Sequence, residues 1–144
     1  MLEDDLLLNA LGEERRVVSV DVGNPQCVCR VDTLDFDWRA VGAALERHPH
    51  FPRGSNVSFV RPFRGNAGHS QLEVRFWERG AGATLSSGTG SLGAAVAARH
   101  LGWVGDLATI RTLGGDLTVD WDGGIRLTGP ACIVVRGRYE VGPP

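Results

Sequence analysis

The sequence contains no lysine. All 15 of its lysine-plus-arginine residues are arginines, in a chain of 144 residues with a formal net charge of −2. A P-loop needs a lysine whose ammonium group binds the β- and γ-phosphates of a nucleotide. Enzymes that form an imine with a carbonyl substrate or with pyridoxal phosphate need a lysine amine. These 144 residues alone therefore cannot form a site of either kind.

Long apolar runs and clusters of basic residues are absent as well. A membrane-spanning helix needs about 20 apolar residues in succession, and the apolar runs here are far shorter. The arginines are scattered, which is not the pattern of a nucleic-acid-binding surface. Acidic residues stand near the start of the chain, where a secretory signal would have basic ones. We therefore expect a cytoplasmic protein that binds neither nucleic acid nor a membrane.

Cysteine is scarce, with Cys27, Cys29 and Cys132 as the three examples. Their number is odd and their spacing matches no zinc site. Cys27 and Cys29 would lie on one face of a strand, and we interpret all three cysteines as small buried hydrophobic side chains in a reducing compartment. The histidines do not combine with cysteines or acids at the spacing of metal ligands, so no metal site is expected.

Many short segments are present, separated by 20 glycines and seven prolines. Alternating apolar residues predict strands over residues 17–22, 27–31, 56–60, 72–78, 117–121, 125–127 and 133–139. Asp37 can cap a helix that ends before Pro49, and residues 91–101 form a clear helix rich in alanine. Residues 1–16 are expected to form a lead-in. The sequence thus predicts one α+β domain over residues 1–144, with a mixed or antiparallel sheet of roughly eight strands wrapped around a central buried helix.

Residues 75–90 carry most of the expected chemistry. Glu78 continues the face of the strand that bears Phe76, where a carboxylate is costly unless a partner uses it. The alternative is that Glu78 lies at the strand's end, in water. Ser87-Gly88-Thr89-Gly90 then stands at the start of the alanine-rich helix. Backbone N–H groups and the helix dipole favour an anion there, such as a carboxylate, although an ordinary helix cap has the same residues.

Six separated motifs occur in a fixed order along the chain. They are Gly23-Asn24-Pro25-Gln26, Ser55-Asn56-Val57-Ser58-Phe59-Val60, Trp77-Glu78-Arg79-Gly80, Ser87-Gly88-Thr89-Gly90, Gly114-Gly115-Asp116-Leu117 and Thr128-Gly129-Pro130-Ala131. In this order and at this spacing they resemble the C-terminal half of diaminopimelate epimerase, over about residues 17–138. A single glycine-rich loop would not carry such a comparison, whereas several motifs in register do.

The resemblance implies an enzyme that interconverts LL- and meso-diaminopimelate without a cofactor, on the route to lysine and peptidoglycan. In that family two half-domains each supply one cysteine, and the two thiols act as acid and base on opposite faces of the α-carbon. A free thiol has a pKa of about 8.5, which a helix N-terminus lowers, so it can fill either role near neutral pH.

Matched residue by residue, the resemblance implies a set of substrate contacts in this chain. Gly88 and Thr89 would offer backbone N–H groups to the α-carboxylate, where negative charge grows as the proton leaves. Glu78 would also lie near the reacting carbon and support catalysis. The other expected substrate contacts are Asn24, Asn56 and Arg79.

The sequence departs from the family at three positions. Ser87 stands at the catalytic cysteine of this half, and a serine hydroxyl needs an adjacent base to act as one. Gln26 stands where the family usually has a histidine, and together with Ser87 and Glu78 it makes up the expected catalytic residues. A glutamine cannot take up a proton at neutral pH. Ala83 replaces a glutamate. The family's first half, with its own cysteine, has no counterpart in these 144 residues.

We therefore expect the substrate-binding and acid–base half of a diaminopimelate epimerase-like protein, with little or no epimerase activity by itself. Its partner would be a complementary N-terminal half, or a second copy that replaces it, because a half-domain exposes the apolar surface that its partner covers. Two alternatives remain. The chain could be a non-catalytic ligand-binding or interaction module that keeps the fold, or an isomerase of the same fold that acts on another acid.

Overall fold

The structure is a computed structural model that describes residues 2–64 and 70–142, and within these residues it has nine strands and two helices. The strands are β1 (Leu2–Ala10), β2 (Glu13–Asp21), β3 (Pro25–Arg30), β4 (Asn56–Arg64), β5 (Ser70–Glu78), β6 (Gly82–Thr84), β7 (Leu107–Thr112), β8 (Gly115–Asp120) and β9 (Arg126–Thr128). The helices are α1 (Trp38–Glu46) and α2 (Gly88–His100).

All nine strands belong to one mixed sheet. Their order is β1-β2-β3-β4-β5-β7-β8-β9, and β6 pairs with β5 beside this path. The pairs β3/β4 and β5/β7 are parallel, and the other pairs are antiparallel. The expected α+β class with a mixed sheet is confirmed. Strands β1, β6 and β7 go beyond the predicted elements.

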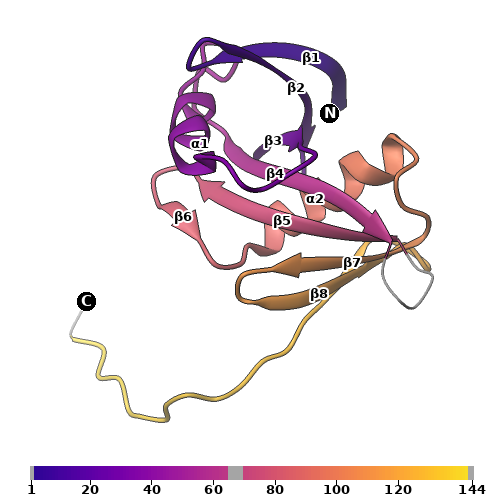
Figure 1. The fold of residues 1–144 in the computed structure, drawn as a ribbon. Helices are drawn as coiled ribbons and strands as arrows, with labels where there is room; N and C mark the ends of the chain where they lie inside the picture. The colour runs from indigo at the N-terminus through magenta and orange to yellow at the C-terminus, as the bar shows by residue number, and fades with distance from the viewer. Residues whose placement is uncertain (1, 65–69, 143–144) are drawn as a thin grey trace.

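The sheet curves around α2, as Figure 1 shows. The helix contacts β2, β3, β4, β5, β7 and β8. Its small residues allow this close packing, because a Cβ atom at Gly90 would lie 2.8 Å from Cδ1 of Phe76. Four alanines of α2 have no exposed surface: Ala94, Ala95, Ala97 and Ala98. The prediction of a buried, alanine-rich helix is therefore confirmed, with a start at Gly88 rather than residue 91.

Helix α1 covers the opposite face of the sheet. Asp37 is its N-cap, as predicted, and its carboxylate accepts a hydrogen bond from the Ala40 N–H at 3.1 Å. Trp38, Val41 and Leu45 are buried in a second core with Cys27, Cys29 and Phe59 among its members. Of the described helices, neither is long and apolar enough to cross a membrane.

The expected lead-in contains strand β1, which pairs with β2 in an antiparallel hairpin. The turn between them has Leu11 at φ 57° and Gly12 at φ 85°, so both turn residues adopt the left-handed conformation that suits a two-residue hairpin turn. Leu8 and Ala10 of β1 are buried. Residues 2–16 therefore contribute to the sheet and to the core over α1.

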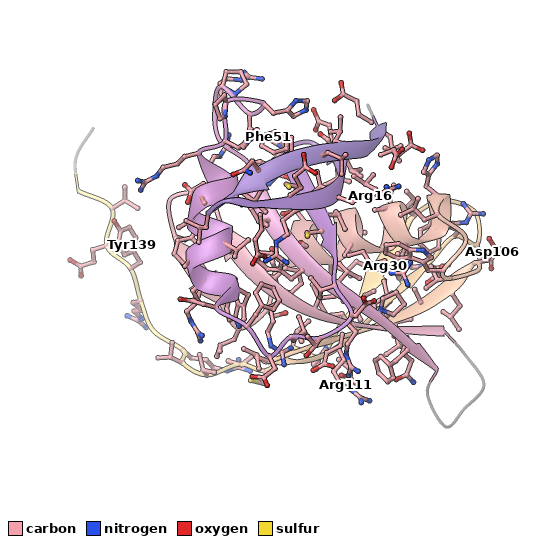
Figure 2. All side chains as sticks on the ribbon, turned by 45° about the horizontal axis from the view of Figure 1, so that its top comes forward. Arg16, Arg30, Phe51, Asp106, Arg111 and Tyr139 are labelled. Carbon is pink, nitrogen blue, oxygen red and sulfur yellow. The ribbon has the colours of Figure 1, made fainter. Side chains whose placement is uncertain are left out.

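The strand predicted over residues 133–139 is wrong. Residues 129–142, here called the C-terminal tail, form neither helix nor strand. Figure 1 shows the tail leaving the sheet after β9, and Figure 2 shows Tyr139 away from the folded body. A strand needs a neighbour for its backbone N–H and C=O groups, and no described strand adjoins the tail. The apolar side chains of the tail are exposed, from 68% at Ile133 to 90% at Tyr139.

Candidate functional site

The sheet topology brings most of the expected site residues to one end of the sheet. Strands β3 and β4 are parallel, so their starts lie side by side, and Gln26 pairs with Asn56. Strand β5 runs antiparallel to β4, so its end lies beside the start of β4. Helix α2 also begins there, since Gly90 lies against Phe76 of β5. Segments that are far apart in the sequence therefore meet at one place.

Asn24 connects β3 to the first turn of α2. Its Nδ2 donates a hydrogen bond to Oγ1 of Thr89 at 3.3 Å, and its Oδ1 accepts one from Nε2 of Gln26 at 2.8 Å. These two bonds fix which end of the Asn24 amide faces the helix. The structure thus joins three of the expected site residues in one hydrogen-bonded chain, Thr89–Asn24–Gln26.

Gln26 has no exposed surface. Its Cγ and Cβ lie against α2, because a Cβ atom at Gly93 would come within 2.8 Å and 2.9 Å of them. Its Oε1 has no hydrogen-bond partner within residues 2–64 and 70–142. An unsatisfied buried amide oxygen is costly, and a carboxamide neither gives nor takes a proton at neutral pH. The structure therefore gives Gln26 a packing and orienting role.

Ser87 is the N-cap of α2. Its Oγ accepts a hydrogen bond from the Gly90 N–H at 3.2 Å, and its carbonyl oxygen accepts one from the Ser91 N–H at 2.9 Å. The side chain is 9% exposed. A serine acts as a nucleophile or base only when a neighbouring group takes its proton. In the described part of the chain no histidine, carboxylate or arginine hydrogen-bonds to this hydroxyl.

The start of α2 is suited to an anion. Gly88 and Thr89 are exposed, and the first N–H groups of a helix have no partner within it. The first turn of α2 contains no acidic residue, whereas its last turn contains Arg99 and His100. The positive end of the helix dipole is therefore not neutralised by a carboxylate of the first turn, and it can attract a ligand's carboxylate.

Glu78 lies at the end of β5, half-buried. Its Oε1 accepts a hydrogen bond from Oγ1 of Thr84 at 2.7 Å. Thr84 reaches it because β6 folds back on β5, with Glu78 opposite Gly82 and Phe76 opposite Thr84. The sequence allowed either a carboxylate on the buried face with a partner or one at the strand's end in water. The Glu78 carboxylate combines the two, since it is half-buried at the strand's end and has Thr84 as a partner.

The side chain of Asn56 is hydrogen-bonded to the backbone of Arg79. Asn56 is 8% exposed; its Nδ2 donates to the Pro25 carbonyl at 3.1 Å, and its Oδ1 accepts from the Arg79 N–H at 3.0 Å. The Arg79 guanidinium donates to the carbonyl oxygens of Arg53 and Gly54, at 2.9 and 3.4 Å. Asn56 therefore holds the start of β3 and the end of β5 together, and Arg79 lies against the loop before β4.

The two buried thiols are not suited to act as bases at neutral pH. Cys27 and Cys29 are buried in the core over α1, as expected, whereas the same expectation is wrong for Cys132, which is exposed in the C-terminal tail. Burial raises the pKa of Cys29 to about 11 and raises that of Cys27 further. Both thiols therefore stay protonated near pH 7. Within the described residues no group of three or more histidines, cysteines and acids could hold a metal ion.

Two supporting residues were not predicted from the sequence. Thr84 is one, and its signal was the glycine-rich turn at residues 80–82, which is typical of a hairpin that returns onto β5. Gly93 is the other, since it lies on the face of α2 that meets Gln26. A glycine inside an otherwise good helix indicates a close approach of this kind.

Two solved structures of phenazine biosynthesis proteins share the fold. One is a putative PhzC/PhzF protein of Clostridium difficile (strain 630), with a TM-score of 0.51, 22% identity, and coverage of 69% of this chain and 35% of that one. The other is a PhzF-family protein of Bacillus anthracis, with a TM-score of 0.52, 17% identity, and coverage of 83% and 36%. At these identities the similarity shows the fold alone.

Sequence relatives are closer. A diaminopimelate epimerase of Methanococcus maripaludis (strain C6) is 40% identical over 126 residues, which cover 85% of this chain and 44% of that protein. One of Moorella thermoacetica is 38% identical over 145 aligned positions, covering 98% and 50%. The chain spans about half the length of the curated relatives it matches. Residues 18–134 match the family model of diaminopimelate epimerase, and the chain therefore belongs to the diaminopimelate epimerase family.

Proposed function

We propose that this chain is the substrate-binding half of a diaminopimelate epimerase-like protein, which holds the α-carboxylate of diaminopimelate at the start of α2. One observation carries the proposal: the exposed first turn at Gly88 and Thr89, free of acids, stands beside the hydrogen-bonded pair Asn24 and Gln26. A carboxylate there would receive backbone N–H donors, the helix dipole and the Asn24 amide.

The acid–base step would depend on Ser87, which occupies the position of the family's cysteine. Negative charge that develops on the carboxylate as the α-proton leaves would be stabilised at Gly88 and Thr89. Glu78 would lie near the reacting carbon. The Ser87 hydroxyl, however, accepts a hydrogen bond from Gly90 and has no basic neighbour in the described residues. The chain would therefore bind a diaminopimelate-like amino acid and epimerise it poorly or not at all.

The wider setting follows from the family. The protein would act without a cofactor, in the cytoplasm, on the route to lysine and peptidoglycan. Its pocket would be completed by a complementary N-terminal half, with a second copy of the chain as the substitute. The relatives' double length supports this arrangement, and so do the exposed apolar side chains of the C-terminal tail, which need a covering surface.

Binding without turnover is the first testable prediction. We expect meso-diaminopimelate to shift the NMR signals of the Gly88 and Thr89 amides. Asn24→Ala should weaken binding at least about tenfold, since one hydrogen bond to a charged group is worth about 1.5–3 kcal/mol. Asn9→Ala, in β1 beside the hairpin turn, is the matched control and should bind normally. The absence of any shift at the start of α2 would refute the proposal, and solvent deuterium at the α-carbon would refute the lack of turnover.

Burial of the C-terminal tail by a partner is the second prediction. Cys132 is the exposed thiol of the tail, while Cys27 and Cys29 are buried. We expect Cys132 to react several-fold more slowly with a thiol reagent once an N-terminal half of the family, or a high concentration of the chain itself, is present. Deletion of residues 129–142 should abolish the association seen by sedimentation. The prediction would be contradicted if the chain stayed monomeric, and Cys132 stayed fully reactive, both with an N-terminal half and at a high concentration of the chain.

A second candidate is a non-catalytic ligand-binding or interaction module, which is favoured by the use of Ser87 as a helix cap and of Gln26 as a packing residue. The two candidates differ in the double variant Ser87→Cys and Gln26→His, assayed with a complementary N-terminal half. Recovered epimerisation would indicate an epimerase with an intact pocket. Absence of ligand binding in every form, the unaltered chain included, would favour an interaction module.

A further inference from the structure

The turn of residues 78–80 carries two expected site residues, Glu78 and Arg79, and its conformation is held by side chains from other elements. The Arg79 N–H donates to Oδ1 of Asn56 at 3.0 Å, and the Gly80 N–H donates to Oε1 of Glu46 at 3.0 Å. The Ala81 N–H closes the turn on the Glu78 carbonyl at 3.0 Å. Gly80 has a φ of 79°, so the chain reverses here through a left-handed residue.

Glu46, the last residue of α1, uses both carboxylate oxygens on β5 and its turn. While Oε1 accepts from Gly80, Oε2 accepts from the indole Nε1 of Trp77 at 2.7 Å. Its backbone carbonyl also accepts from the Ser55 N–H at 3.1 Å, just before β4 begins. One residue of α1 therefore contacts the turn, the strand that leads into it and the loop beside it.

Two glycines make this approach possible. A Cβ atom at Gly42, one helical turn before Glu46, would lie 2.7 Å from Cβ of Trp77. A Cβ atom at Gly54 would lie 3.0 Å from Cδ of Arg79 and 3.3 Å from the Glu46 carbonyl oxygen. A larger residue at Gly42 would push α1 away from Trp77, and one at Gly54 would push the loop of residues 53–54 away from Arg79. The contacts of Glu46 therefore depend on close packing of these segments.

We propose that Glu46 is a positioning residue for the site: its carboxylate fixes the turn of residues 78–80 and thereby the placement of Glu78 and Arg79. The effect on ligand affinity rests on the proposed function, whereas the effect on the turn does not. Glu46 lies on the face of the sheet opposite α2, so it acts through the backbone of the turn. A carboxylate suits this position because each of its two oxygens can accept one of the two N–H groups, whereas a carboxamide has only one oxygen.

The variant Glu46→Gln tests the proposal. Its single amide oxygen can accept from Gly80 or from Trp77, and its NH₂ group then faces the remaining donor. We expect hydrogen exchange at the Gly80 amide to accelerate about tenfold or more, with changed signals at Arg79, and affinity for meso-diaminopimelate to fall about tenfold. Trp77→Phe is the matched control, since it removes the indole donor and leaves the Gly80 bond. It should keep slow exchange at Gly80 and near-normal affinity.

Each outcome decides the proposal. Unchanged Gly80 exchange in a folded Glu46→Gln protein would overturn it, and so would equal effects of the two variants, because packing of the indole would then hold the turn. Faster exchange with unchanged affinity would overturn the link to the ligand. If the unaltered chain shows no shift of the Gly88 and Thr89 amides with meso-diaminopimelate, the proposed function fails, and the Gly80 and Arg79 signals still decide whether Glu46 holds the turn.

Discussion

Replacing Phe59 by alanine is expected to lower the free energy of unfolding by about 3–5 kcal/mol. Phe59 lies in β4 with no exposed surface. Its ring meets Phe36 edge-on, with centroids 5.4 Å apart, and Trp38 at 6.5 Å. Since Trp38 begins α1, this ring joins the sheet to the helix that ends in Glu46. Alanine would leave a cavity that α1, attached at both ends, can fill only in part.

Urea unfolding monitored by far-UV circular dichroism would measure the loss. Phe63→Ala is the control on the same strand, because Phe63 is only half-buried and contacts the guanidinium groups of Arg61 and Arg111. We expect a loss of about 1 kcal/mol there. Equal losses at the two positions would mean that Phe59 does not connect α1 to the sheet in the way that its ring contacts indicate.

Local patterns predicted the elements that carry their own signals. Asp37 and Ser87 cap helices where the sequence placed a cap and a helix start, because capping depends on residues only three apart. Strand β1 was not expected, since its sequence has three acids in succession and little alternation, and its pairing with β2 determines its conformation. Strand β7 does alternate, with Ala108, Ile110 and Thr112 buried, so its signal was present in the sequence.

The failure at residues 133–139 has a different cause. Ile133, Val134 and Val135 favour a strand by their side chains, but a strand also needs a neighbour, which local sequence does not specify. Propensity alone therefore overestimates structure in a segment that no described strand adjoins. The tail keeps the composition of a buried strand without a described surface to bury it.

The site residues likewise differ in whether local sequence or long-range topology determines their contacts. Ser87, Gly88 and Thr89 were identified from a helix start, and Glu78 from the face of its strand. The resemblance added Asn24, Gln26, Asn56 and Arg79. The sequence could not show that both polar groups of the Asn56 amide are taken by backbone groups, because Pro25 and Arg79 are 31 and 23 residues away. Nor could it identify Glu46, which is 34 residues from Gly80. Contacts at such separations follow from the sheet topology.

Replacing Gly93 by valine is expected to destabilise the protein by about 3 kcal/mol. The new Cβ would lie 2.8 Å from Cγ of Gln26, and Gln26 has no exposed surface into which it could move. Gly105→Val is the matched control, because Gly105 is exposed, its φ is not positive and no atom lies within 4 Å of the added Cβ. Thermal and urea unfolding should show a loss at residue 93 and a change within about 0.5 kcal/mol at residue 105.

The double variant Gly93→Val and Gln26→Ala separates packing from the organisation of the site. Removal of Cγ and the amide eliminates the nearer contact, so the double variant should regain at least about 1 kcal/mol relative to the sum of the single losses. The double variant should bind the ligand more weakly than the unaltered chain does, because Asn24 then lacks the Gln26 N–H donor that orients its amide toward Thr89. Additive losses would contradict the contact between Gly93 and Gln26. Recovered stability together with normal binding would show that Asn24 is held without Gln26, and the identity of residue 26 would then have no bearing on the site.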